Sequence, residues 1–540
     1  MSTTTEDSPR LVQTMGEILD NAGDVLTENG APTHSTSGSK IVDLYDAMGG
    51  LRHDPLSIIP IFREAWDEDP LAATKCMFLL RNPRGGMGER TLFDVLVKYL
   101  TESPDPEKRL AIWANMHLFS KYGRWDDLMV VFMHGDFGDT SVDGRGDTLS
   151  RQVVRIIQAQ LKRDIYALQQ GKLEKISLLA KWLPSDNASS KTTKHVARKL
   201  IAALGIGQKK YRKYLVSLRK ALSDAVVETK MSSRQFETID YGKVCSKAGL
   251  NYRKAFTKRD KERYEQWIQD VANGKSSVNA AVLHPHEITS RAMHMEEADA
   301  ATIQGMQNIW DALPDYGMTG DAIAVLDVSP SMTFETISKN SKITPLEACL
   351  GLGTYLSQRC SGKFKDHFIT FSDHPEIMKI QGDNIVEISN WLKNHPGAGY
   401  STNLEAVFDV MLDAVEEASD MPEYLYILTD GEFDAPAHAA NGTFTLPTNH
   451  QVIQQKFDAK GLPMPKLVYW NLQRRLEHES HRKNNIAMKE NDYGLVASGF
   501  SPAMIEPIMR CEVISPRAIV EEALKPYDDV RLDMGPDFCS

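Results

Sequence analysis

The chain has 540 residues and a formal net charge of −11, with 62 Lys and Arg against 73 Asp and Glu. This length exceeds what one hydrophobic core serves and predicts two or three domains. The absence of a run of about 18 apolar residues argues against a membrane-spanning helix. The N-terminal sequence MSTTTEDSPR has neither the basic nor the apolar region of a secretory signal. We therefore expect a cytoplasmic protein of several domains.

The cysteine pattern indicates neither a disulfide framework nor a zinc site, because no CxxC pair occurs. We expect scattered thiols, mostly buried. The six cysteines are Cys76, Cys245, Cys349, Cys360, Cys511 and Cys539.

The first part of the chain is predicted to be a flexible arm followed by helices. Residues 1–40 are rich in Ser, Thr, Asp, Glu and Gly and resemble a disordered lead-in. Residues 41–304 carry apolar side chains at three-to-four spacing, separated by short Gly, Pro, Asp or Asn breaks. This pattern predicts an all-helical region of the α-solenoid or irregular HEAT-like kind, although no repeat of fixed period occurs. The clearest helical segments are 91–100, 109–122, 149–168 and 193–204.

The last part of the chain is predicted to be a doubly wound α/β domain. Residues 305–320 contain Pro and Gly and are typical of a connector. From 321 to 540, short apolar strands alternate with amphipathic helices, which indicates a mainly parallel sheet covered on both faces. The predicted strands are 322–329, 367–372, 423–430, 466–473 and 495–500. The predicted helices are 345–360, 385–394, 403–418, 450–460, 502–510 and 516–524.

Oxygen-bearing side chains follow three of these predicted elements. Asp327, Ser329 and Ser331 end the first strand, Thr402 closes the glycine-rich loop GAGYST, and Asp430 ends a later strand. Ligands of open α/β sheets bind at the carboxyl ends of the strands. Two carboxylates and three hydroxyls form an oxygen-only set that suits Mg²⁺, with Mn²⁺ or Ca²⁺ as alternatives. The sequence thus predicts a divalent metal site with one coordination position left for a partner's acidic group.

This DxSxS, Thr and TDG set resembles the metal-ion-dependent adhesion site (MIDAS) of von Willebrand factor A (vWA) domains. The resemblance implies a site that binds a partner instead of catalysing a reaction. The alternative is that these residues are helix caps and turn residues of an unrelated Rossmann-like domain. A general base would have to come from Glu432, Asp434 or His374, and no nucleophile elbow, P-loop or HExxH motif occurs. We therefore expect no enzymatic activity.

The charge of the helical region is uneven. Residues 191–263 hold 20 Lys and Arg against 6 Asp and Glu, a local balance of +14 within an acidic chain. Basic side chains attract phosphates, and the interleaved aromatic residues could stack on unpaired bases. The alternative is a solvated helix face whose aromatic side chains lie in the core. The predicted nucleic-acid contacts are Lys191, Lys194, Lys209, Lys210, Arg212, Lys213, Arg219, Lys220, Arg253 and Lys254. The aromatic residues among them are Tyr211, Tyr214, Phe236, Tyr241, Tyr252, Phe256 and Tyr264.

A second basic site is predicted in LLRNPRGGMGER, where Arg81, Arg84 and Arg90 flank a glycine-rich turn. Backbone amides and arginines of such a turn could hold a phosphate. The glycines could equally serve the backbone geometry of a tight turn alone.

Several longer motifs widen the resemblance. They are RNPRGGMGER, YGRWDDL, LLAKWLPSDN, YRKYLVSLRKAL, LHPHEI, VYWNLQ and LVASGFS. Together they resemble an uncharacterised family that joins an all-helical region to a C-terminal vWA domain, similar in layout to the TROVE proteins, the Ro ribonucleoprotein autoantigens. In Ro proteins a ring of HEAT-like helices is closed by the vWA domain and binds single-stranded RNA ends and small structured RNAs. The resemblance implies an RNA-binding scaffold.

Two hypotheses follow. The first is an RNA-binding, ribonucleoprotein-type scaffold with a metal-binding vWA domain. The second is a protein–protein adaptor that acts through the metal and a partner's carboxylate and needs no RNA. The mixed-charge loop at 474–493 has no assigned role in either.

Overall fold

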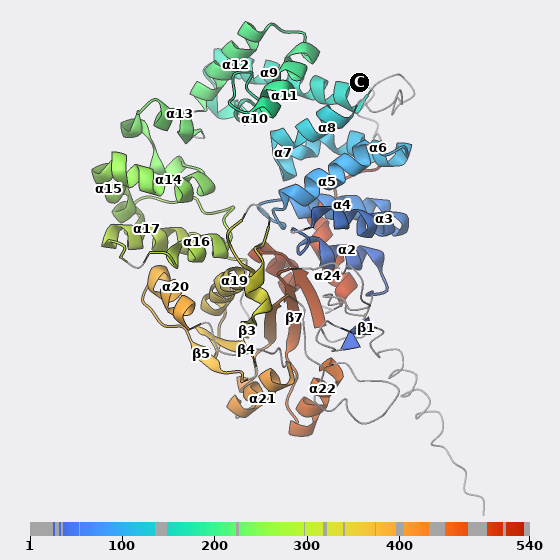
Figure 1. Ribbon diagram of the computed structural model, residues 1–540, viewed down its shortest axis with the longest axis vertical. Coiled ribbons are helices and arrows are strands. Elements are labelled where there is room, and N and C mark those ends of the chain that lie inside the picture. Colours follow the sequence, from blue (N-terminus) through green and yellow to red (C-terminus); the bar gives the residue numbers. More distant parts are fainter. Residues whose placement is uncertain are drawn as a thin grey trace, which may run out of the picture. The chain divides into compact units, whose positions relative to one another are not determined.

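The computed structural model (Figure 1) shows a helical region followed by a C-terminal sheet domain, and the chain divides into two compact units. The sheet unit comprises the residues up to Asp69, His284–Glu297 and Asp315–Lys525. The helical unit comprises Pro70–Leu283, Ala298–Pro314 and the residues from Pro526 onward. The structure describes residues 36–52, 54–135, 148–222, 226–295, 297–316, 321–338, 341–372, 374–395, 404–415, 417–430, 449–473, 494–510 and 515–533, with the short strands β1 (Val25–Leu26) and β2 (Pro32–Thr33).

The helical unit is a succession of mostly short helices, and side chains cap the N-termini of some of them. The side chains of Asp105, Thr148 and Ser190 each accept a hydrogen bond from a backbone N–H of the first turn, which satisfies donors that have no partner within the helix. The helices are α4 (Pro70–Arg81), α5 (Arg90–Thr101), α6 (Pro106–Asn115), α7 (Phe119–Tyr122), α8 (Leu128–His134), α9 (Leu149–Gln169), α10 (Leu179–Trp182), α11 (Lys191–Ala203), α12 (Gln208–Ala221), α13 (Val227–Ser232), α14 (Ser246–Arg259), α15 (Lys261–Ala272) and α17 (Ala300–Asp311).

Two predicted segments differ from the structure here. The segment 109–122 is not one helix, because a 3-10 turn, η2 (Met116–Leu118), separates α6 from α7. Residues 305–311, expected in a connector, belong to α17. That helix packs against α15, where Asn308 donates to the carbonyl of Ile268 at 2.8 Å. Tertiary packing of buried residues such as Trp310 thus overrides the connector-like composition.

The last described residues of the chain also belong to the helical unit. Tyr527, in the turn η9 (Lys525–Tyr527), places its ring 4.8 Å from that of Tyr122 and accepts a hydrogen bond from Asn82 at 3.0 Å. Asp529 accepts a hydrogen bond from Tyr122 and pairs with Lys121, both at 2.6 Å. The C-terminal segment is therefore fastened to helices near the start of the unit.

The sheet unit is built on six strands in the order β5-β4-β3-β6-β7-β8. All neighbours pair in parallel except β5, a three-residue antiparallel edge strand that the sequence pattern did not predict. The predicted doubly wound sheet is otherwise present, with strand ends shifted by one or two residues. The strands are β3 (Ala322–Asp327), β4 (His367–Phe371), β5 (Ile377–Lys379), β6 (Tyr424–Thr429), β7 (Lys466–Asn471) and β8 (Gly494–Ser498).

Helices cover both faces of the sheet (Figure 1). Alternation along β3 sends Ile323 and Val325 into a core shared with Phe408 of α21 and Phe457 of α22. On the opposite face, Leu326 lies against Gly353 of α19, where a Cβ would come within 2.2 Å of the leucine. The helices are α18 (Ser331–Phe334), α19 (Pro345–Arg359), α20 (Ile385–Asn394), α21 (Leu404–Ala414), α22 (Asn449–Lys460), α23 (Ile505–Arg510) and α24 (Pro516–Leu524).

Helices from the N-terminal half also pack in this unit, namely α2 (Lys40–Met48), α3 (Ile58–Glu68) and α16 (Pro285–Ala292). Gly49 donates its backbone N–H to Ser498 of β8 at 3.1 Å, and a Cβ at Gly49 would meet the Ser498 backbone at 2.4 Å. Likewise, Gly351 of α19 lets the backbone of His286 in α16 approach. Glycine therefore permits both close contacts.

Most of the predicted N-terminal arm, the last part of the connector (317–320) and the loop 474–493 lie outside the described residues. Residues 36–40 do not form the expected flexible lead-in, because Ser37 bonds to Asp43 and Ser39 bonds to Glu68. No helix in the described part of the chain is long and apolar enough to cross a membrane.

Candidate functional site

Four of the five predicted metal ligands, Asp327, Ser329, Ser331 and Asp430, lie at the carboxyl edge of the sheet, by its two central strands. Strand order reverses there, since β3 pairs with β4 on one side and with β6 on the other. Ligands of open α/β sheets bind at such a switch point, because the loops diverge and leave a crevice. Asp327 ends β3, and Asp430 directly follows β6. The register therefore places the two carboxylates on neighbouring strands at one edge.

Asp327 is fully buried and held in place from two sides. Its Oδ1 accepts a hydrogen bond from the backbone N–H of Ser329 at 3.0 Å, and its Oδ2 accepts one from the hydroxyl of Thr429 at 2.7 Å. Asp430 is also fully buried. A carboxylate without bulk water needs such donors or a cation, because burial disfavours its charge.

The hydroxyls of Ser329 and Ser331 lie 2.9 Å apart, so the turn after β3 brings them together as the sequence predicted. Thr333, two residues further on, donates its hydroxyl to the carbonyl of Pro330 at 2.7 Å. The Thr333 hydroxyl therefore bonds within the turn, whereas the hydroxyl oxygens of Ser329 and Ser331 lie next to each other.

Thr402, the remaining predicted ligand, lies outside the described residues, as do Glu432 and Asp434. His374 is described and exposed, with its backbone N–H donated to Ser372. Within the described ranges, no group of three or more His, Cys, Asp or Glu side chains could hold a metal ion. A metal at this edge would therefore rely on hydroxyl oxygens beside the two carboxylates.

Burial, and then the neighbouring charge of Asp430, raise the pKa of Asp327 above its ordinary value. Two carboxylates that repel each other in a buried place are the arrangement that a divalent cation neutralises. The oxygen donors of Asp327, Asp430, Ser329 and Ser331 fit Mg²⁺ by type, since hard cations prefer oxygen. The residues present thus fit the predicted ion.

Cys349 belongs to the surroundings of these carboxylates, although sequence reasoning did not connect it with them. It lies on α19, is fully buried and directs its thiol to the carbonyl of Leu428 at 3.6 Å. Burial, with further contributions from Asp327 and Asp430, raises the pKa of the thiol. A neutral thiol adds no charge to the pair. The packing of α19 on β3 and β6 brings it there, so no motif could have revealed it.

Some of the predicted nucleic-acid contacts are exposed side chains, whereas others form hydrogen bonds or ion pairs within the protein. On α12, Tyr211, Leu215 and Leu218 are buried, so Lys209, Lys213 and Lys220 occupy the opposite, solvent-facing side. Lys191, Lys209, Lys210, Lys213, Lys220 and Lys254 are exposed, whereas Lys194 and Arg253 are partly buried.

Two arginines of this set hold the fold together instead. Arg219 donates to the carbonyls of Ala180 and Leu183 and to the hydroxyl of Ser185, at 2.8–2.9 Å. Arg212 pairs with the buried carboxylate of Asp186 at 2.7 Å, and this pairing lowers the pKa of Asp186. Both residues tie α12 to the segment before α11. Since these contacts occupy the donors of Arg219, we correct its predicted role from RNA contact to structural clamp.

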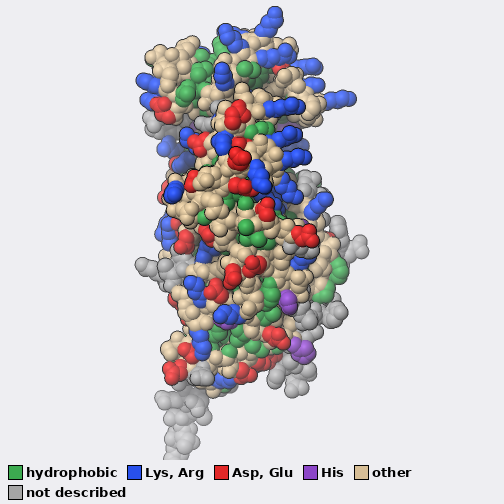
Figure 2. All heavy atoms as spheres, turned by 90° about the vertical axis from the view of Figure 1, so that its left-hand side faces the viewer, with side chains coloured by type: hydrophobic (Ala, Val, Ile, Leu, Met, Phe, Trp, Pro, Cys, Tyr) green, Lys and Arg blue, Asp and Glu red, His purple; other side chains and the backbone are tan. Residues whose placement is uncertain are grey.

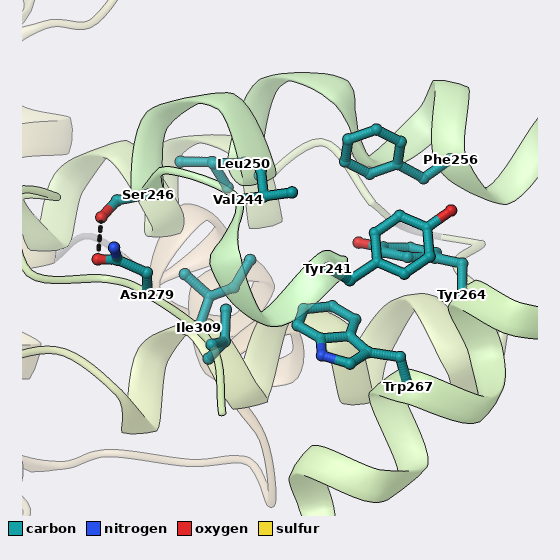
Figure 3. Close-up of a pocket in the computed structure, with 11 residues that line it drawn as sticks. Tyr241, Val244, Ser246, Leu250, Phe256, Tyr264, Trp267, Asn279 and Ile309 are labelled. Carbon is teal, nitrogen blue, oxygen red and sulfur yellow. Dashed lines mark hydrogen bonds between the residues drawn. The ribbon is translucent and has the colours of Figure 1, made fainter. Parts of the chain in front are cut away.

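The aromatic residues do not form the expected stacking surface. Tyr241, Phe256 and Tyr264 are buried and pack on one another and on Trp267, with ring centroids 4.9–5.6 Å apart. Figure 3 shows these rings turned toward each other around a small pocket. Tyr211 is also buried, and its hydroxyl donates to the carbonyl of Pro184. These rings build the core of the unit, which was the alternative interpretation. Tyr214, Phe236 and Tyr252 are partly buried.

The predicted phosphate site at Arg81, Arg84 and Arg90 is not assembled as expected. Arg81 is buried and forms a two-point ion pair with Asp127, at 2.8 and 3.2 Å, so its guanidinium faces inward. Arg90 pairs with Asp126 at 2.8 Å, whereas Arg84 is exposed on the turn. The glycine-rich turn serves backbone geometry, since Gly86 packs against the carbonyl of Leu79.

Helix α9 adds basic residues that the sequence reasoning left out. Figure 2 shows Lys and Arg side chains gathered at the end of the helical unit that carries α9, α11 and α12. From 148 to 222 the chain has 17 Lys and Arg against three acids. Asp164 and Asp186 are buried, which leaves Glu174 as the exposed acid. Counting charge over residues 149–168 as well as 191–263 would have found this surface.

The family model described as Domain of unknown function (DUF2828) matches residues 27–132 and 140–313, more than half of the chain. The chain belongs to this family. A second model, described as Domain of unknown function (DUF7788), matches residues 321–530. The chain is 28% identical over 530 residues to Uncharacterized protein L728 of Acanthamoeba polyphaga mimivirus, covering 93% of this chain and 87% of the relative. The crystal structure of the Deinococcus radiodurans RO (RSR) protein aligns with 91% of this chain and 95% of its own, at 13% identity and a TM-score of 0.38.

The DUF2828 match contains the basic helices α9, α11 and α12, whereas the buried carboxylates lie in the DUF7788 match. The two candidate sites therefore fall in different units of this DUF2828 chain.

Proposed function

We propose that this protein is a non-enzymatic RNA-binding scaffold, of the ribonucleoprotein type, whose vWA-like sheet domain binds a divalent cation and a partner. The observation that carries the RNA proposal is the basic surface of α9, α11 and α12. Exposed lysines project from it, while two of the three acids between 148 and 222 are buried.

Electrostatics gives this surface its proposed role. The segment 148–222 has a formal balance of +14, so the rest of the chain sums to −25. A polyanion is attracted to the basic helices and repelled by the remainder, which confines binding to one place. The cations lie on regular helices, so their positions are set by a rigid support. RNA phosphates would replace the counterions of this surface.

The test is charge reversal of three exposed lysines at the start of α12. The triple variant Lys209→Glu, Lys210→Glu and Lys213→Glu should abolish binding of a labelled single-stranded RNA in fluorescence anisotropy. Arg212 is left intact because it pairs with Asp186. RNA binding that survives the triple variant would overturn the proposal.

The matched control reverses three exposed lysines of the sheet unit, Lys342, Lys365 and Lys379. It changes the net charge by the same amount at a different place. Retained binding in this control excludes a general effect of the chain's charge.

For the metal we propose Mg²⁺ held by Asp327, Ser329, Ser331 and Asp430, with Thr402 as a further ligand, as in a MIDAS. The support is the position of two buried carboxylates at the switch point of the sheet. The ion would supply an electrophilic position that accepts a carboxylate oxygen. The chain's own residues fix the ligands, since Thr429 and the Ser329 backbone orient Asp327. Calorimetric titration of the full chain with MgCl₂ tests this, and Asp430→Asn should remove the binding heat.

A second candidate function, a protein–protein adaptor, is favoured by one further observation. Phe334, three residues after Ser331 on α18, is 76% exposed. A protein partner whose carboxylate binds the metal could also bury a large apolar side chain close to it in the sequence. If adaptor function is the main role, Asp327→Ala and Phe334→Ser should each abolish partner co-purification and leave RNA association unchanged. If the scaffold proposal holds, the lysine reversal removes RNA, and Asp327→Ala removes only the protein partner.

A further inference from the structure

The outer face of α9 carries an exposed aromatic side chain among cations. Tyr166 is 64% exposed, and among the described Phe, Tyr and Trp residues of the helical unit it is the one exposed by more than about a third. A single exposed apolar side chain is ordinary on a protein surface. The surroundings of Tyr166 distinguish it.

Helix periodicity places basic side chains on the same face as Tyr166. Lys162 and Arg155, four and eleven positions before it, lie within about 40° of it around the helix axis, and both are exposed, as is Arg163. With a rise of about 1.5 Å per residue, Lys162 lies about 6 Å and Arg155 about 16 Å along the axis from Tyr166. The exposed Ala159 lies between Lys162 and Arg155 on this face. This face of α9 thus carries one cation near the Tyr166 ring and another further along the helix.

No carboxylate of α9 opposes these cations. Asp164, the acidic residue of the helix, is buried and accepts hydrogen bonds from the backbone and hydroxyl of Ser177 and from Gln160, at 2.7–3.0 Å. Its charge is therefore satisfied inside the unit. Helix α9 also packs on α11 and α12, so its cations continue the basic surface already described.

Four other aromatic residues of the basic region cannot take this role. Tyr211, Tyr241, Phe256 and Tyr264 are at most 5% exposed, so no base can stack on their rings. A basic surface without an accessible ring binds phosphates and does not distinguish paired from unpaired RNA. An exposed aromatic ring among cations distinguishes unpaired from paired RNA, because only an unpaired base exposes its face for stacking.

We propose that the α9 face binds unpaired RNA, with the Tyr166 ring stacked on a base and Lys162 and Arg163 holding the adjacent phosphates. This inference rests on the proposed RNA-binding function and specifies its substrate class. The protein then prefers single-stranded RNA over a duplex of equal length, and Tyr166 causes the preference.

The experiment compares a labelled 12-nucleotide single-stranded RNA with a 12-base-pair duplex, measured by anisotropy on the full chain. Tyr166→Ala should weaken single-strand binding about tenfold, within the range for loss of one stacked base, and leave duplex binding unchanged. Tyr166→Phe should restore the preference, because its ring is retained. The variants should fold like the parent, since the side chain is largely exposed, and thermal melting checks this.

The outcomes separate the two proposals. If Tyr166→Ala changes neither affinity, or lowers both equally, while the lysine reversal on α12 removes both, RNA binding stands and the stacking inference is wrong. If the unmodified protein binds neither RNA, the proposed function fails and the inference fails with it. Ultraviolet cross-linking of the single strand should yield an adduct in the peptide that contains Tyr166. An adduct found elsewhere and absent from α9 would also overturn the inference.

Discussion

Neutralising the three exposed lysines at the start of α12 should reduce the salt dependence of RNA binding by a calculable amount. The variant carries Gln at Lys209, Lys210 and Lys213. All three side chains are exposed, and the buried side of α12 is formed by other residues. The change therefore removes three positive charges and leaves the packing of the helix intact.

The magnitude follows from counterion release. Each phosphate contact of a single strand contributes about 0.7 to the slope of log K against log salt, so three lost contacts lower the slope by about 2. The electrostatic contribution to the association constant vanishes at about 1 M salt. A slope lower by about 2 therefore corresponds to an association constant about fifty-fold lower at about 0.15 M salt. The effect on folding should stay within about 0.5 kcal/mol, as for other exposed substitutions.

The assay is fluorescence anisotropy of a labelled single-stranded RNA at several NaCl concentrations between about 0.05 and 0.3 M. The control variant carries Gln at Lys342, Lys365 and Lys379, which are exposed in the sheet unit, and should keep the parent slope. A parent-like slope in the α12 variant, or an equal loss in both variants, would refute the assignment of phosphate contacts to α12.

Three further predictions concern stability. Burial raises the pKa of Asp94 to about 6, above the 3.8 of an unperturbed carboxyl; the charge of Arg90 opposes this rise and that of Asp127 adds to it. Asp94 therefore makes the folded state lose stability as pH rises from about 4 to about 6. Asp94→Asn should make this loss smaller in denaturant titrations, and the variant should be about 1–2 kcal/mol more stable than the parent at neutral pH. Gly351→Ala should lower stability by about 1–3 kcal/mol in thermal melting, because its Cβ would lie 2.7–2.8 Å from the backbone of His286. Asp127→Ala should cost about 3–5 kcal/mol in chemical denaturation, since it leaves the guanidinium of Arg81 buried without its carboxylate.

Each of these predictions has a control in the same chain. Gly207→Ala, where nothing lies within 4 Å of an added Cβ, should change the melting temperature little. Asp69→Asn changes an exposed carboxyl and should keep the parent's loss of stability between pH 4 and 6. For Asp127, the paired change Arg81→Met with Asp127→Leu should recover part of the loss, because no unpaired charge remains buried. A Gly351→Ala chain that melts at the parent temperature would contradict the close packing of α16 on α19.

The strands and helices of the sheet unit could be predicted because each has a strong local signal. The apolar run of β3 is buried at every position, and buried parallel strands show such runs. The edge strand β5 lacks the signal, since it has three residues that are only partly buried or exposed. Residues 305–311 of α17 were assigned to a connector because Pro314, Gly317 and Gly320 follow them, whereas contacts with α15 decide their conformation.

The candidate sites likewise combine features that the local sequence predicts with features that tertiary contacts decide. The order of Asp327, Ser329, Ser331 and Asp430 along the chain, each at a strand end, is a property of the sequence, and a parallel sheet brings such ends to one edge. By contrast, the sequence does not determine which basic side chains are exposed to a ligand. Arg219 and Lys220 are neighbours of like charge, yet one clamps the segment before α11 and the other faces solvent.

The sequence alone thus determined the all-helical region, the alternating sheet region, the oxygen-bearing side chains after two strand ends and the existence of a local excess of positive charge. Periodicity and strand ends are local, so one chain suffices to read them. Tertiary structure decided which cations are exposed, since this depends on partners such as Asp186 and Asp127 that are distant in the chain. It also decided that the rings of Tyr211, Tyr241, Phe256 and Tyr264 are buried and that Tyr166 of α9 meets solvent, because burial depends on the face that each helix turns toward its neighbours.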